Sequence, residues 1–257
     1  MIEFDVGPPA AFAQLFAVCP DLGGARKHFW YDWGPIFYRG RLDGSAKVLC
    51  VASDPGPTER IAGRTLVGDA GQRVQGFLAK LGITRSYLCL NAFAYALIPS
   101  ESASGEAVLT EAAQLAWRNI LYDLSHGPDL QAIIAFGVQA QQAVNLWPGR
   151  STTPVAQVPH PTSHDEANLL KQWNKAIQHL HSIVTPDADG DATATNYGQQ
   201  FLESDYAPIP RRDLPFGAPT FLGDDAWARA SSPPIRSSVS RPAHDDRHTL
   251  VWIAPKS

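Results

Sequence analysis

Three polar residues in the sequence could together support hydrolysis: Asp54, Asn91 and His160. A carboxylate can orient water or stabilise a cation, an imidazole can hydrogen-bond a developing negative charge, and an amide donates and accepts hydrogen bonds at once. Each residue alone has an ordinary explanation, because Asp before Pro-Gly favours a turn, and Asn or His is common in loops. The set gains significance only if the fold brings its members together.

The segments before these residues have the composition of buried strands, and helical patterns separate them. Strands are predicted from short apolar runs over residues 46–52, 86–90, 132–136 and 154–158. Helices are predicted from apolar residues at helical spacing over residues 70–81, 104–124, 138–146 and 165–183. This alternation predicts an α/β fold, a three-layer α/β/α sandwich around a central four-stranded parallel sheet.

In such a sheet, ligands bind beyond the carboxyl ends of the strands. Asp54, Asn91 and His160 each stand within two residues of a predicted strand end, so we expect them to share one site. Gly68 and Gly71 stand near the start of a predicted helix, where backbone amides can hold a phosphate.

The composition is that of an ordinary globular protein, with 257 residues, 44% of them hydrophobic, and a formal net charge of -4. No apolar run is long enough to span a membrane, and no signal-like start is present, so a cytoplasmic protein is expected. The net charge argues against a large basic surface that coats DNA. A local basic patch is compatible with it, and so are scattered solvated charges, at Arg60, Arg64, Arg73, Lys80 and Arg85.

The three cysteines, Cys19, Cys50 and Cys89, are odd in number and show no CxxC spacing, which argues against a disulfide framework or a four-cysteine metal site. His160 and His164 are spaced like metal ligands, but a loop HxxxH is weak evidence. We expect no metal and no cofactor.

The chain is expected to fold as one domain over residues 1–185, followed by an extension over residues 186–257. The extension is rich in Pro, Ser and Arg, which indicates a segment packed on the core or partly disordered. Residues 249–253 could add an edge strand, and a monomer is expected.

Four motifs resemble those of the uracil-DNA glycosylase superfamily, particularly its iron-sulfur-containing family 4. DPGPTER (54–60) and GRTLVGDAGQ (63–72) are similar to the first motif, LCLN (88–91) to the segment with the uracil-reading Asn, and PHPTS (159–163) to the second motif. The resemblance covers roughly residues 47–182 and implies the same sandwich fold. It also implies an enzyme that flips uracil out of single- or double-stranded DNA and hydrolyses the N-glycosidic bond.

The resemblance assigns roles to individual residues. Asp54 would activate water, as in family 1 enzymes, and His160 would stabilise the leaving base. The residues expected to bind the substrate base are Asn91, Ser53, Gly56, Leu66 and Phe93. The residues expected to contact the DNA backbone are Arg64, Gly68, Gly71 and Ser163.

Several departures from the family pattern limit these expectations. The cysteines of the family 4 cluster are missing, so no iron-sulfur cluster is expected. Gly56 stands where family 1 has a Tyr that blocks the thymine methyl group, and Leu66 stands where the family has a stacking Phe, so Phe93 or Tyr95 is the expected substitute. A basic His-bearing insertion after the Asn strand is missing, so turnover is expected and not covalent trapping. No Lys is evident at the site to form a Schiff base, which implies a monofunctional enzyme.

Three alternatives remain open. One is a broader base range that includes hypoxanthine, xanthine or 5-substituted uracils. Another is a non-catalytic DNA- or nucleotide-binding protein on the same fold. The third, an unrelated α/β hydrolase or nucleotide-binding enzyme, is disfavoured because GxSxG, GxxxxGK[ST] and GxGxxG motifs are missing.

Overall fold

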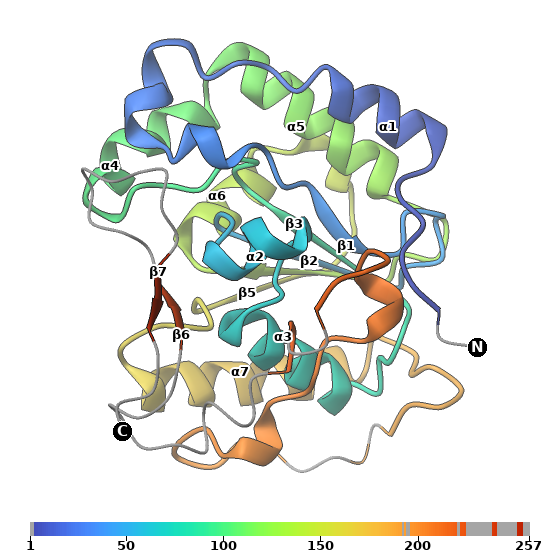
Figure 1. Ribbon diagram of the computed structural model, residues 1–257. Helices are drawn as coiled ribbons and strands as arrows, with labels where there is room; N and C mark the ends of the chain where they lie inside the picture. The colour runs from blue at the N-terminus through green and yellow to red at the C-terminus, as the bar shows by residue number, and fades with distance from the viewer. Residues whose placement is uncertain are drawn as a thin grey trace.

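A mixed sheet of five strands forms the centre of the molecule in the computed structural model (Figure 1). The structure describes residues 3–191, 193, 196–219 and 222–224, and the strands at 238–240 and 251–253. The strands of the central sheet are β1 Tyr38–Gly40, β2 Val48–Ala52, β3 Tyr87–Asn91, β4 Ala132–Phe136 and β5 Val155–Val158. Their order in the sheet is β1-β3-β2-β4-β5.

The predicted parallel strands and the α/β sandwich are confirmed, but the sheet has one strand more than predicted. β2 to β5 are parallel, whereas β1 pairs with β3 in the antiparallel direction. β1 has only three residues, and the fully buried Arg39 stands at its centre where an apolar residue would have signalled a strand.

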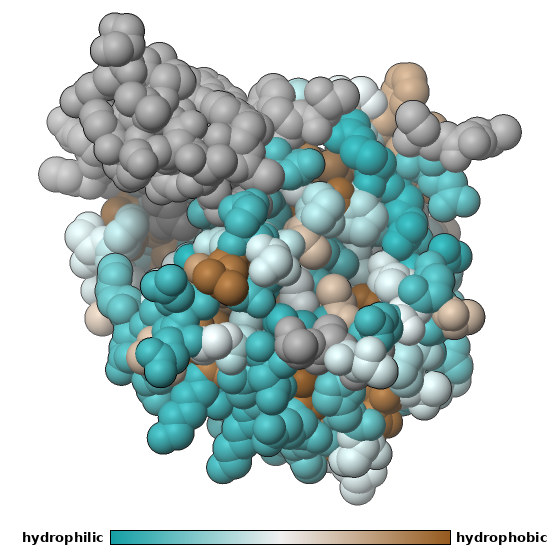
Figure 2. Space-filling model, turned by 90° about the horizontal axis from the view of Figure 1, so that it is seen from below, coloured by the Kyte–Doolittle hydropathy of each residue, from teal (hydrophilic) through white to brown (hydrophobic). Residues whose placement is uncertain are grey.

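Helices cover both faces of the sheet (Figure 1). One layer consists of α1 Ala10–Ala17, α5 Ala112–Ser125 and α6 Val138–Asn145. The other consists of α3 Asp69–Lys80 and α7 Glu166–Leu180. The shorter helices are α2 Pro57–Ala62 and α4 Ser102–Gly105. The outer face on the α7 side is largely hydrophilic (Figure 2).

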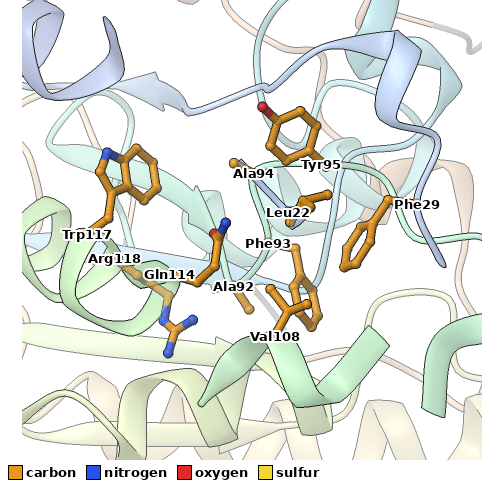
Figure 3. Close-up of a pocket in the computed structure, with 10 residues that line it drawn as sticks. All are labelled: Leu22, Phe29, Ala92, Phe93, Ala94, Tyr95, Val108, Gln114, Trp117 and Arg118. Carbon is orange, nitrogen blue, oxygen red and sulfur yellow. The ribbon is translucent and has the colours of Figure 1, made fainter. Parts of the chain in front are cut away.

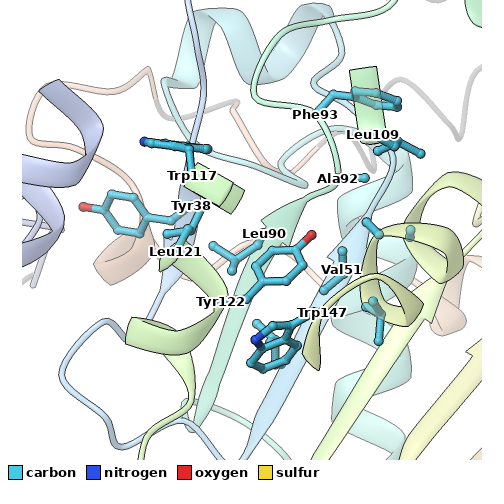
Figure 4. Packing of buried hydrophobic residues seen from close by; sticks show 14 of the residues in the cluster. Tyr38, Val51, Leu90, Ala92, Phe93, Leu109, Trp117, Leu121, Tyr122 and Trp147 are labelled. Atoms are coloured by element: carbon cyan, nitrogen blue, oxygen red, sulfur yellow. The ribbon is translucent and has the colours of Figure 1, made fainter. Parts of the chain in front are cut away.

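Side chains of each strand alternate between the two layers, as the strand geometry requires. Leu49 and Val51 of β2 belong to the cluster under α1, α5 and α6, which also contains Tyr122 and Trp147 (Figure 4). Val48, Cys50 and Ala52 of the same strand belong to the cluster under α3 and α7. This alternation decides which layer each residue at the strand ends faces.

The predicted helix over residues 104–124 is divided in the structure. A 3-10 turn, Glu106–Leu109, follows α4, and α5 then begins at Ala112. The carboxylate of Glu111 accepts hydrogen bonds from the backbone N–H groups of Ala113 and Gln114, which caps a new helix at this point. Helical periodicity continues across such an internal cap, so the pattern alone did not reveal the break.

The described part of the C-terminal extension packs on the core. Ile209 and Leu214 form a buried cluster with Val67, and Tyr197 joins the cluster under α3 and α7. A Cβ added at Gly76 of α3 would lie only 1.9 Å from the carbonyl oxygen of Asp205, so extension and helix are in direct backbone contact.

The strand predicted over residues 249–253 is observed in part, in a different sheet. β7 (Val251–Ile253) pairs antiparallel with β6 (Ser238–Ser240), and these strands form a separate two-stranded sheet. Thr249 and Leu250 lie outside the described residues. Among the described helices, none combines the length and the apolar character that crossing a membrane requires.

Gly76→Ala should destabilise the protein, because the added methyl group must displace the backbone of Asp205. We expect a loss of ~1–3 kcal/mol in the free energy of unfolding, the usual cost of overpacking, measured by urea denaturation. Gly24→Ala is the matched control, since a Cβ there meets no atom within 4 Å. Equal stability of the two variants would contradict the observed packing of the extension on α3.

Candidate functional site

The predicted trio lies at the carboxyl edge of the sheet. Asn91 is the last residue of β3, and Asp54 and His160 follow the ends of β2 and β5 by two residues. The side chains two positions earlier in each case, Ala52, Cys89 and Val158, belong to the cluster under α3 and α7. Within β3 the alternation directs the Asn91 side chain to this side of the sheet, and Asp54 and His160 follow the ends of the strands on the same edge.

The Asn91 side chain is buried, with 6% of its surface exposed. Neither its amide nitrogen nor its amide oxygen has a hydrogen-bond partner among the residues that the structure describes. An unsatisfied buried polar group costs about 1–3 kcal/mol. Some other described residues have one such side-chain atom, whereas Asn91 has two. The arrangement is suited to a ligand that supplies one acceptor and one donor side by side.

Asp54 is fixed next to the chain that follows Asn91. Its carboxylate oxygen Oδ2 accepts the backbone N–H of Leu97 at 2.9 Å. The backbone N–H of Phe93 donates to the carbonyl oxygen of Ser53 at 2.9 Å, which extends the β2–β3 pairing past the strand ends. The two loops therefore form one unit.

His160 lies in a tight turn, in which the N–H of Ser163 donates to the His160 carbonyl oxygen at 2.9 Å. The backbone N–H of Thr162 lies 3.3 Å from Nδ1 of His160, and the Thr162 hydroxyl lies 2.9 Å from it. Because a backbone N–H can only donate, Nδ1 is an acceptor, and the proton of the neutral ring is on Nε2.

The environment of His160 favours the neutral imidazole. Burial lowers its pKa below the usual value of 6.5, and the negative charge of Asp54 opposes this shift only in part. Gly137 packs closely against the His160 side chain, because a Cβ at Gly137 would lie 3.0 Å from Cβ of His160.

Glu59 connects two loops of the site, a role that the sequence analysis did not assign. Its buried carboxylate accepts the backbone N–H groups of Gly56, Val67 and Gly68 at 2.9, 2.7 and 2.9 Å. The N–H of Gly68, predicted to face a phosphate, donates inward instead. The signal was present in the sequence, because an acid three residues after the residue that precedes a helix can accept that residue's N–H, as in a capping box.

Leu66 has a strained backbone conformation. It lies between Thr65, whose carbonyl oxygen Arg39 binds, and Val67, whose N–H Glu59 binds. Its φ of +52° is in the left-handed region, which is costly for a branched side chain. The preceding carbonyl, of Thr65, accepts a hydrogen bond from Nε of the buried Arg39 at 3.1 Å. A Cβ at Gly71 would lie 1.7 Å from the Leu66 carbonyl oxygen, so glycine is required there by packing. Leu66 packs in the cluster on the Asn91 side of the sheet.

Phe93 and Tyr95, the expected stacking partners, lie on the other side of the sheet, so this expectation was wrong. Phe93 is 3% exposed and packs edge-on against Phe29, with ring centroids 5.6 Å apart. Tyr95 stacks on Tyr31 at 4.9 Å. Both rings line a small pocket under α5 (Figure 3). The chain turns towards the α5 layer directly after Asn91, a change of direction that the strand pattern does not encode.

The five basic residues considered as a DNA-binding patch have intramolecular partners. Four of them form ion pairs of 3.9 Å or less: Arg64 with Asp5, Arg73 with Glu166, Lys80 with Asp205 and Arg85 with Asp189. Arg60 lies over the ring of Trp33. The Arg64 guanidinium, expected to contact the DNA backbone, is directed to Asp5 and the ring of Tyr38.

The remaining candidates surround His160 and Asp54. An open groove beside His160 is lined by polar and apolar residues, Val138, Ser163 and Gln172 among them, and by no Asp, Glu, Lys or Arg. Ser53 is buried directly before Asp54. Gly56 approaches Glu59 so closely that a Cβ would lie 2.6 Å from the carboxylate, which explains why no side chain is present there.

The cysteines do not fit an iron-sulfur cluster, which takes four thiolates. Cys50 and Cys89 are register partners in the core, and Cys19 lies apart beside Tyr95, where burial raises its pKa to about 11. Within the part of the chain that the structure describes, no group of three or more His, Cys, Asp or Glu side chains could hold a metal ion.

Residues 39–181, more than half of the chain, match the family model described as the uracil DNA glycosylase superfamily. The chain belongs to this superfamily. The match contains Asp54, Asn91 and His160 and ends before the packed extension. A search of curated proteins finds no match. Membership supports a hydrolase that releases bases from DNA, with DNA as its partner.

Replacing Asn91 with Leu should leave the stability of the fold unchanged or increase it. The substitution should also abolish ligand binding by the side-chain amide. The substitution removes two buried polar atoms that have no described partner, so we expect no loss and up to ~1–3 kcal/mol of gain in urea denaturation.

Asn174→Leu is the matched control. The Asn174 amide donates to the Tyr197 carbonyl oxygen at 2.9 Å and accepts the Tyr197 N–H at 2.8 Å, so its loss should destabilise the protein. If both variants lost stability equally, Asn91 would be a structural residue and not a ligand-binding one.

Proposed function

We propose that the protein is a monofunctional DNA glycosylase that removes uracil and leaves an abasic site. The observation that carries the proposal is the unpartnered, buried amide of Asn91. Uracil presents an acceptor at O4 beside a donor at N3, which match the amide nitrogen and oxygen. Cytosine presents the opposite pattern at both positions, so each mismatch would leave a buried group unpaired, at about 1–3 kcal/mol.

The proposed reaction begins with extrusion of the base, at a cost of a few kcal/mol that is smallest for mismatched or single-stranded sites. The flipped base would lie against Leu66 on the Asn91 side of the sheet. The groove beside His160, which Ser163 lines, would receive the adjacent strand. The amide of Gly71, in the first turn of α3, would lie near a phosphate. The contacts described for Arg64 and Gly68 favour a structural role for both.

Bond scission would produce a sugar oxocarbenium ion and a uracil anion. The Nε2–H of neutral His160 would donate to the charge that develops on O2, and loss of such a donor typically costs about 3 kcal/mol. The carboxylate of Asp54 would stabilise the cation and orient the attacking water. Asp54 and His160 thus have separate roles, and the desolvation that keeps His160 neutral supports this division.

The resemblance supports a broader range of bases, because Gly56 stands where family 1 enzymes have the Tyr that blocks a 5-methyl group. We therefore include hypoxanthine, xanthine and 5-substituted uracils as candidate substrates beside uracil. A cytoplasmic location and a monomeric state remain predictions from the sequence.

The activity is tested with fluorescent single-stranded and duplex oligonucleotides that contain one uracil. We expect abasic sites, detected by alkaline cleavage, without added metal and without nicking before alkali. Asp54→Asn and His160→Ala should each lower the single-turnover rate by roughly 100-fold or more. Binding without base release by the wild type would support the non-catalytic alternative, and nicking before alkali would exclude a monofunctional enzyme.

The pH dependence of stability tests the lowered pKa of His160. Because its pKa is lowered in the folded state, the unfolded chain binds a proton below about pH 6.5 that the folded chain does not bind. The free energy of unfolding should therefore fall as the pH decreases from 7.5 to 5. His160→Asn should show a shallower decrease over this range, and equal slopes would refute the pKa shift.

A further inference from the structure

Arg73 of α3 reaches the turn that carries His160. Its Nη1 donates to the carbonyl oxygen of Pro161 at 2.8 Å. On the other side of His160, Nε1 of Trp173 donates to the carbonyl oxygen of Pro159 at 3.1 Å. The Pro159–His160 and Pro161–Thr162 peptide groups are therefore each fixed by a side chain from a different helix.

The Arg73 side chain is only 17% exposed and contacts several other side chains. Its Nε donates to the hydroxyl of Tyr206 at 2.9 Å, and its guanidinium lies 4.1 Å from the ring centroid of Phe201. The carboxylate of Glu166 lies 3.9 Å from Nη2 and also accepts the backbone N–H of Phe201 at 3.0 Å. Arg73 is thus bound between α7 and the C-terminal extension.

We infer that Arg73 is a positioning residue for His160 and that the extension over residues 197–214 belongs to the catalytic unit because it holds Arg73. The inference rests on the proposed function in one respect, namely that His160 acts on the leaving base. The extension lies outside residues 39–181, the range that matches the superfamily model.

A second contact of the extension supports the same conclusion. Asp213 is fully buried and forms an ion pair with Arg39 at 3.3 Å. Arg39 binds the Thr65 carbonyl oxygen next to Leu66. The extension therefore supports the loop on the Leu66 side of the site as well as the His160 turn. We place the end of the catalytic unit beyond residue 185, at about residue 214.

A phosphate contact is the rival explanation for Arg73. The guanidinium has a carboxylate, a carbonyl and a hydroxyl as partners, and a phosphate would have to replace them. Positioning and phosphate binding also predict different kinetics. Misplacing His160 slows the chemical step, whereas losing a phosphate contact weakens DNA binding and reduces its salt dependence.

The kinetic experiment compares Arg73→Gln and Tyr206→Phe with wild type on uracil-containing duplex DNA. We expect the single-turnover rate of Arg73→Gln to fall roughly 10- to 100-fold with KM within twofold of wild type and an unchanged salt dependence of DNA binding. Tyr206→Phe, which removes only one hydroxyl, should lower the rate roughly two- to fivefold. Arg85→Gln is the control, because it removes an exposed ion pair with Asp189 and should behave as wild type.

A second measurement does not depend on activity. Two-bond proton–nitrogen NMR spectra distinguish the protonated from the unprotonated ring nitrogen of a histidine, and His160→Asn assigns the signals. In wild type we expect a single neutral form with the proton on Nε2, and in Arg73→Gln a mixture of both tautomers. This result would support positioning even if no base release were detected, so failure of the inference and failure of the proposed function are distinguishable.

Two outcomes would overturn the inference. One is an increase of KM with an unchanged rate and a shallower salt dependence, which would identify a phosphate ligand. The other is a folded Arg73→Gln whose rate and His160 spectrum equal those of wild type. If Arg73→Gln fails to fold, the single-turnover rate and the His160 NMR spectrum of Tyr206→Phe test the inference instead.

Discussion

The account depends on a side-chain amide that is buried at the end of β3 without a described hydrogen-bond partner. Asn91 is held there because the strand is paired on both sides and because its own carbonyl oxygen accepts the Tyr122 hydroxyl at 3.3 Å. The unpaired amide of Asn91 therefore lowers the stability of the fold locally, at the position proposed to select the ligand. Such a site is organised before the ligand arrives, which reduces the cost of binding.

The loops around this amide are fixed mainly by charged groups that bind backbone atoms. Glu59 binds N–H groups of the loops that contain Gly56 and Gly68, and Arg39 and Arg73 bind the carbonyl oxygens of Thr65 and Pro161. Each of these side chains is long enough to reach a loop from an element of the scaffold. This arrangement offsets the strained backbone of Leu66, while the side-chain amide of Asn91 keeps no described hydrogen-bond partner.

Sequence patterns predicted the layers, the parallel strands and the place of Asp54, Asn91 and His160, because strand alternation and chain direction fix them. They did not predict β1, whose central residue is a buried Arg39, or the inward direction of Phe93. They also could not show that Gly68 donates to Glu59, or that the extension contributes Asp213 to the core. These features depend on contacts between distant segments, which leave no periodic signal in either segment alone.

The most direct test of the central claim is a titration of the wild-type protein with free uracil and free cytosine, monitored at the side-chain amide resonances of Asn91, which Asn91→Leu assigns. The account predicts that uracil shifts these resonances in a saturable manner and that cytosine does not at the same concentration. Equal shifts with both bases, or none with uracil, would contradict the claim that the Asn91 amide reads the base.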